Sequence, residues 1–184
     1  MTRKILPLAA LIIFCSSFNL HNSGVFIAKN STISFFSKTG MQNIRAKSID
    51  CKGSVDIHKR TFSFTIPMGS FQGFDNALQK RHFCEKFADC IKFPDSGFKG
   101  KIIEDINLSV PGTYTVRGKG ILSIHGVDQE RIIDTQVVVK DGEVTIDSKF
   151  PIALADHNIK ITKMASTVIA KIVNVEVKIS MTPS

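Results

Sequence analysis

The stretch of sequence that decides the fold runs from Gly73 to Pro94 and reads GFDNALQKRHFCEKFADCIKFP. Most of the chain after its first thirty residues alternates apolar and polar residues, whereas helix-forming residues predominate here. Apolar residues recur three and four positions apart, which predicts a stripe along one helix face: Phe74, Ala77, Leu78, Phe83, Phe87 and Ile91. Gly73 in front and Pro94 behind therefore bound one predicted helical insertion, over residues 74–91.

On both sides of this insertion, alternation with a period of two predicts β-strands. One face of a strand is predicted at Phe62, Phe64 and Ile66, and two longer faces lie near the C-terminus: Val144, Ile146, Phe150, Ile152 and Leu154, then Val173, Val175, Val177, Ile179 and Met181. Asp141-Gly142 predicts a hairpin turn. Seven to nine short strands joined by short turns indicate a mainly β protein, an antiparallel sandwich or barrel, interrupted by one helix.

Composition limits the functional classes. The chain has 184 residues, enough for one domain with a sizeable core, and a formal charge of +8. Its basic residues are dispersed along the sequence, which does not favour a nucleic-acid partner. One tyrosine and no tryptophan leave little material for the aromatic girdles of a membrane-spanning barrel.

The N-terminus resembles a targeting segment. It combines a basic start at Arg3 and Lys4 with an apolar run from Ile5 to Phe14 that is too short to span a bilayer. We predict a signal peptide over residues 1–17, a mature domain over residues 18–184, and export, in a bacterium to the periplasm. A lipoprotein anchored through Cys15 is the alternative, which the bulky Phe14 before it disfavours.

Three cysteines follow the predicted leader: Cys51, Cys84 and Cys90. An odd number leaves at least one thiol unpaired or intermolecular. In an unbroken helix, Cys84 and Cys90 are separated by about 9 Å between Cα atoms, more than the roughly 7 Å that a disulfide permits. They pair only if the helix ends early, and small buried cysteines are the alternative.

Several short motifs stand out beside the strand pattern: the strand and corner Gly120-Ile121-Leu122-Ser123-Ile124-His125-Gly126-Val127, and the pairs and triplet His82-Phe83, Phe93-Pro94 and Phe98-Lys99-Gly100. Together they resemble the pattern of the YceI-like family of exported bacterial proteins. The segment from Leu154 to Ile161 departs from the commoner form by carrying Asp156. The resemblance implies a lipocalin-like antiparallel barrel of about eight strands that binds long polyisoprenoid lipids, with the helix at its mouth.

The aromatic residues fit this implied function. Eight of the fourteen phenylalanines lie between positions 62 and 98, which suits an apolar lining but also a plain core. If the barrel is hollow, we expect ten residues to line the ligand cavity, with the helical pair Phe83 and Phe87 closing it: Phe62, Phe64, Phe83, Phe87, Leu122, Ile124, Phe150, Ile152, Val173 and Val175. The expected partner is an apolar lipid, a polyisoprenoid or isoprenoid quinone, held for transport, storage or stress protection. Transient contact with a membrane surface and the oligomeric state stay open.

Two other functional classes are also compatible with the sequence. A filled barrel would act as an envelope interaction or stress protein without a lipid. An enzyme acting on a lumen-bound lipid would need His82 or His125 in the cavity beside a carboxylate, for which Glu85 on the helix is a candidate. Because such pairs are common on helix surfaces and a corner histidine commonly bonds a loop backbone, no catalytic residue is predicted, nor any metal or cofactor.

Overall fold

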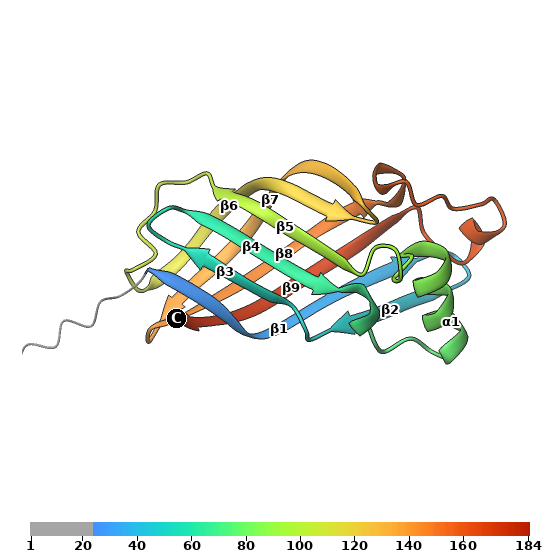
Figure 1. Cartoon of the computed structure of the whole chain (residues 1–184), viewed down its shortest axis with the longest axis horizontal. Helices are drawn as coiled ribbons and strands as arrows, with labels where there is room; N and C mark the ends of the chain where they lie inside the picture. The colour runs from blue at the N-terminus through green and yellow to red at the C-terminus, as the bar shows by residue number, and fades with distance from the viewer. Residues whose placement is uncertain (1–23) are drawn as a thin grey trace, which may run out of the picture.

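The computed structural model describes residues 24–184, so the predicted leader at 1–17 lies outside the described residues. This part of the chain forms nine antiparallel strands (Figure 1): β1 Val25–Lys38, β2 Asn43–Ser48, β3 Lys52–Asp56, β4 Thr61–Pro67, β5 Asp95–Ile102, β6 Gly112–Ile124, β7 Val127–Lys140, β8 Glu143–Ala153 and β9 Ile172–Pro183.

The sheet closes on itself because β1 pairs with β9 along almost its whole length, from Phe26 opposite Pro183 to Phe36 opposite Asn174. On its other edge, β1 pairs with β2 over residues 33–38 and with β3 over residues 25–27, so these two short strands share one position. The result is the predicted antiparallel barrel with eight strand positions. The break between β2 and β3 falls at residues 49–51, just before Lys52-Gly53, where the glycine favours a bend in the strand.

Alternation along the strands sorts the side chains as predicted. The inward faces of β8 and β9 are buried at Val144, Ile146, Val173, Val175 and Ile179. Their outward faces carry ion pairs between the two strands. Lys149 contacts Glu176 at 3.0 Å and Lys178 contacts Asp147 at 3.8 Å, on the solvent-exposed side of the sheet. Within residues 24–184, no helix has the length and apolar character needed to cross a membrane.

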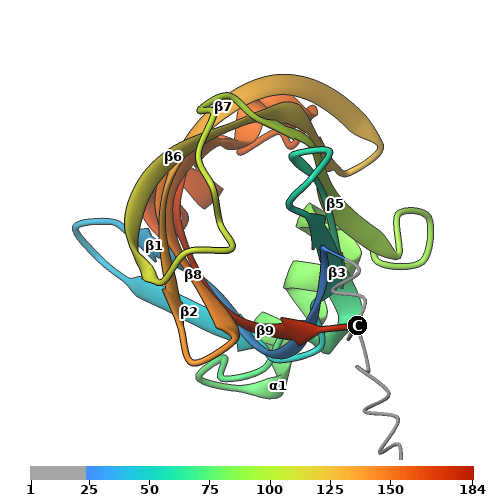
Figure 2. The same cartoon turned by 90° about the vertical axis from the view of Figure 1, so that its left-hand side faces the viewer.

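The two ends of the barrel differ. One end, called here the helix end, carries the connections 39–42, 68–94, 125–126 and 154–171, and lies on the right of Figure 1. The opposite, far end carries 57–60, 103–111 and 141–142. Figure 2 looks onto the far end and shows the β5–β6 connection crossing it. Leu108 of this connection is 3% exposed and belongs to a cluster that also contains Phe26, Val144 and Met181, so the far end is packed shut.

The helical insertion is shorter than the predicted 74–91. Helix α1 spans Ala77–His82. Asn76 is its N-cap, and the Asn76 side-chain oxygen accepts a hydrogen bond from the Gln79 amide at 2.9 Å. A π-helical turn, Phe83–Phe87, completes it. Asp89 then adopts a φ of 46°, a left-handed conformation that terminates the helix. Short 3₁₀ turns at Met68–Ser70, Leu154–His157 and Ala165–Thr167 complete the helix end.

Candidate functional site

A cavity of about 470 Å³ occupies the barrel and opens at the helix end. Its wall extends from His82 and Gln42 at the mouth to Val116, Val137 and Ile179, in the half of these strands that lies toward the far end. Beyond these residues the far-end cluster fills the lumen. The cavity is therefore a blind tube with one mouth, far larger than the roughly 30 Å³ that one water molecule occupies.

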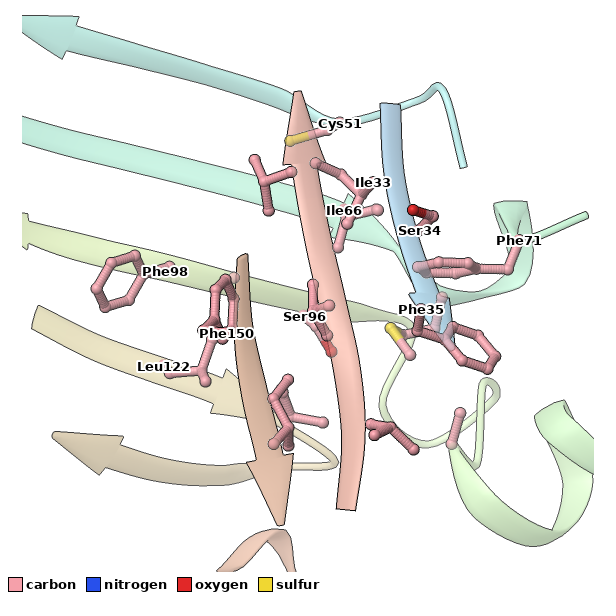
Figure 3. A pocket seen from close by; sticks show the side chains of 18 of the residues that line it. Ile33, Ser34, Phe35, Cys51, Ile66, Phe71, Ser96, Phe98, Leu122 and Phe150 are labelled. Atoms are coloured by element: carbon pink, nitrogen blue, oxygen red, sulfur yellow. The ribbon is translucent and has the colours of Figure 1, made fainter. Parts of the chain in front are cut away.

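All ten residues expected from the sequence lie on this wall. Those on strands come from the inward faces of β4, β6, β8 and β9. Figure 3 shows two of them, Leu122 and Phe150, beside Phe98 of β5, a wall residue that was not among the ten. Phe64 and Phe150 stay only half-buried although they point inward, because the hollow leaves one side of each ring without neighbours. Their contact with a ligand stays a prediction.

Sequence reasoning missed part of the wall. Phe35 and Ile33 of β1, Phe71 after the first 3₁₀ turn, and Val168 and Ile169 of the last connection also line the cavity. For β1 a signal existed, since Ile33, Phe35 and Ser37 share one parity. The last connection carries a misleading signal, because the sequence pattern over residues 166–181 is typical of one strand, whereas β9 begins only at Ile172.

Four phenylalanines form a cluster at the mouth. The Phe83 ring of the π-helical turn stacks on Phe35 with ring centroids 5.4 Å apart, and contacts Phe71 at 5.7 Å and Phe74 at 5.3 Å. Such pairs contribute about 0.5–1.5 kcal/mol each beyond their burial. Phe83 is thereby fixed to the barrel rim and anchors the helical segment.

Phe87 occupies a different environment from Phe83. It lines the cavity but lies outside both the packed core and the aromatic cluster. Three other members of the predicted helical stripe face solvent: Ala77 is exposed, Leu78 is 48% exposed and Ile91 is 96% exposed. Only Phe74, Phe83 and Phe87 of that stripe face the cavity, because the chain reverses at Asp89 before the helix can present Ile91.

A disulfide joins Cys84 and Cys90, whose Cα atoms are 4.9 Å apart. This pairing is the outcome that required an early helix end, and the reversal at Asp89 supplies it. The bridge encloses Phe87 and Ala88, two wall residues, of which Ala88 is 4% exposed. The disulfide therefore fixes the segment that borders the mouth.

Two histidines tie together two helix-end connections. The Nδ1 of His125 donates to the His157 carbonyl at 3.1 Å, and the Nδ1 of His157 donates to the Val127 carbonyl at 3.2 Å. The predicted structural role of His125, a corner histidine bonded to a loop backbone, is thus confirmed. His157 is 1% exposed, and burial lowers its pKa, since the charged form is poorly solvated there.

The corner at Gly126 also receives the segment that follows the disulfide. The Phe93 ring lies against His125 with centroids 4.7 Å apart. Gly126 has a φ of +69°, and a Cβ built there would meet Phe93 at 2.3 Å. A glycine is required for both reasons, which explains physically why His-Gly and Phe-Pro occur together in this chain.

The polar part of the wall carries no formal charge. No lysine, arginine, aspartate or glutamate of residues 24–184 lines the cavity; its polar groups are hydroxyls, two glutamines and the rings of His82 and His125. Ser96 is 7% exposed, and its hydroxyl is the one buried side-chain oxygen or nitrogen in the described chain without a hydrogen-bond partner. Figure 3 shows it facing the cavity.

Reactive groups are not assembled here. Burial raises the pKa of the Cys51 thiol to about 11, so this wall residue is protonated and a poor nucleophile at neutral pH. Among the residues that the structure describes, no three His, Cys, Asp or Glu side chains gather closely enough to hold a metal ion. The site is suited to enclosing an apolar molecule.

Comparison with known proteins gives a family and a fold. The YceI-like domain model matches residues 25–181, nearly the whole described chain. No curated protein sequence matches at a significant level.

Among solved structures, a polyisoprenoid binding domain from Saccharophagus degradans, implicated in plant cell wall breakdown, is similar with a TM-score of 0.73 at 13% identity. The match covers 88% of this chain and 99% of that one. BcnA of Burkholderia cenocepacia gives a TM-score of 0.67 at 18% identity, covering 82% of this chain and 95% of that one. The YceI protein of Campylobacter jejuni gives 0.59 at 17%, covering 75% and 84%.

Proposed function

The chain belongs to the YceI-like family, and from that premise we propose that it is an exported binding protein that holds a long apolar lipid in its barrel. The ligand class is a polyisoprenoid or isoprenoid quinone. One observation carries the proposal: a blind cavity of about 470 Å³ whose wall is almost wholly aliphatic and aromatic. A similar fold is described as a polyisoprenoid binding domain, which supports the same ligand class.

Desolvation supplies the affinity. Burying one CH₂ group contributes about 0.8 kcal/mol, so a five-carbon isoprene unit contributes a few kcal/mol, and several units bind tightly without polar contacts. A linear chain fits a tube better than a bulky molecule does. Because the far end is packed by Leu108 and its neighbours, the chain enters tail first.

The head group then lies at the helix end among uncharged polar groups. A phosphate or carboxylate there would lose its hydration without gaining an opposite charge, since no lysine or arginine in residues 24–184 lines the wall. A carbonyl or hydroxyl oxygen would instead find a partner in the Ser96 hydroxyl. We therefore propose an uncharged oxygenated head, which favours a quinone or an alcohol over a diphosphate.

Binding without conversion is the proposed role. His82 and His125 both line the cavity, but no carboxylate of the described chain lines it beside them, and His125 is already bonded to the His157 carbonyl. The lipid-free interaction protein is disfavoured by the size of the hollow, which side chains leave empty.

Export is part of the proposal. It rests on the basic and apolar N-terminal sequence and on the Cys84–Cys90 disulfide, because disulfides persist mainly in oxidising compartments such as the periplasm. Transport, storage and protection under stress all use the same bound state.

Lipid extraction and mass spectrometry of natively purified protein test the proposal. We expect an isoprenoid, a quinone or another long apolar chain in the wild type. Leu122→Trp places a large ring in the cavity and should remove most of it, whereas Ile121→Trp, next to it on the outward face of β6, should not. A wild-type extract without any such lipid, from protein purified without detergent, would refute the proposed function.

A further inference from the structure

The most exposed apolar side chains gather at the helix end. Ile91 is 96% exposed, Met164 is 83% exposed and Met41 is 78% exposed, and these are the three highest values among large apolar residues of the described chain. They come from three different connections of that end. Each lies within three residues of a wall residue, namely Ala88, Ala165 and Gln42, so all three side chains come from segments that border the cavity.

The connections that carry these side chains are held together. Thr39 donates to the Thr167 carbonyl at 2.8 Å, and the Ala170 amide donates to the Ser37 hydroxyl at 2.9 Å, which joins the 39–42 and 154–171 connections. The disulfide and the Phe93–His125 contact fix the segment that carries Ile91. The exposed apolar groups are therefore carried by connections that are fixed to the same end of the barrel.

Charge is distributed unequally between the two ends. The helix-end connections contain seven basic residues, four in 68–94 and three in 154–171, against four acidic residues. The far-end connections contain two basic and three acidic residues. None of those seven helix-end basic residues belongs to an ion pair within residues 24–184, whereas the basic partners of all seven ion pairs lie on strands or at the far end.

We infer that the helix end docks on a lipid bilayer that contains anionic headgroups. Exposed apolar side chains on an end whose connections also carry basic residues outside any ion pair match such a surface, since the basic residues meet the headgroups while Met41, Ile91 and Met164 enter the interface. This inference deepens the proposed function, because docking sets the mouth of the cavity directly against the membrane. A bound lipid could then exchange without crossing water.

Cosedimentation with vesicles tests the inference. We expect the wild type to bind vesicles of phosphatidylcholine and phosphatidylglycerol, to release them as salt is raised, and to bind phosphatidylcholine alone at least tenfold more weakly. Met41→Ser/Ile91→Ser/Met164→Ser should reduce binding at least tenfold. Lys160→Gln/Lys163→Gln should reduce it about thirtyfold, at about a fivefold effect per lysine.

The far end provides the matched control. Ile103→Ser/Val110→Ser removes two exposed apolar side chains there, which are 40% and 49% exposed, and should leave vesicle binding unchanged. All these side chains are exposed, and circular dichroism verifies folding. Equal loss in this control, or no binding of wild type to anionic vesicles, overturns the docking inference. The cavity ligand is assayed separately by extraction, so either proposal can fail alone.

Discussion

Replacing Phe87 by alanine tests whether this side chain closes the cavity over a ligand, as a gate, or only packs in the core. Phe87 lines the cavity but belongs to neither the packed core nor the aromatic cluster, so we expect Phe87→Ala to lower the free energy of unfolding by less than about 1.5 kcal/mol. A bound lipid would cover one side of its ring. Since fully burying such a side chain contributes about 1.5–3 kcal/mol, losing half of it raises Kd about fourfold to twelvefold.

Phe83→Ala is the matched comparison. Phe83 contacts three other rings, and its removal should lower the free energy of unfolding by about 2–4 kcal/mol. Stability is measured by urea unfolding followed by far-UV circular dichroism, because the chain has no tryptophan and one tyrosine. Affinity is measured by displacement of a fluorescent isoprenoid analogue, whose signal is then free of tryptophan background.

The result that would refute the gate is specific. A loss of more than 3 kcal/mol in Phe87→Ala, with the Kd for the analogue unchanged, would mark Phe87 as an ordinary core residue. The same outcome would remove the reason for assigning the helical segment a part in ligand retention. If Phe87 is a gate, most of the increase in Kd of Phe87→Ala should come from a faster dissociation rate of the analogue.

Three further perturbations test separate features. Cys84→Ser/Cys90→Ser should lower the free energy of unfolding by about 2 kcal/mol, the chain-entropy value for so short a loop, and accelerate release of the analogue; an unchanged release rate would show that the bridge does not restrain the mouth. Gly126→Ala should cost about 2–4 kcal/mol, and Gly142→Ala, which has a φ of +77° but no neighbour within 4 Å, only about 1 kcal/mol; equal losses in urea unfolding would contradict the clash described above. Because the pKa of His157 is lowered in the fold, the unfolded chain binds more protons, so stability should be full above about pH 6.5 and decline as pH falls below it; His157→Gln should flatten this decline, and an identical pH profile would show another group to be responsible.

The barrel was predictable because strand alternation is a local property. The alternation of apolar and polar residues from Val144 to Ile152 and from Val173 to Ile179 indicates which face of each strand is buried. The structure confirms both faces. Hollowness was not predictable from the same pattern. The alternation along a strand tells which residues point inward. The diameter of the barrel depends instead on the pairing of β1 with β9, two strands at opposite ends of the chain.

The helical insertion shows why periodicity can mislead. Ile91 continues the apolar spacing of Phe83 and Phe87, so the sequence predicted a helix up to it. The left-handed residue Asp89 and the disulfide turn the chain beforehand, and Ile91 is left in solvent. Neither a single positive φ at an aspartate nor a particular cysteine pairing has a reliable local signature.

The charge pattern was hidden for a related reason. Basic residues such as Lys86 and Lys163 are far apart in sequence and looked dispersed. The topology brings alternate connections to the same end of the barrel, so these residues share one end only in the fold.

The packed far end has a consequence for any role of the barrel in transport. A tube open at both ends can act as a conduit, passing a molecule from one side to the other while it stays in place. Here Leu108 and its neighbours close one end, so entry and exit use a single opening. A carrier built this way is a shuttle: it must leave the donor surface, reorient in solution and present the same face to the acceptor, and the last part of its cargo to enter is the first to leave.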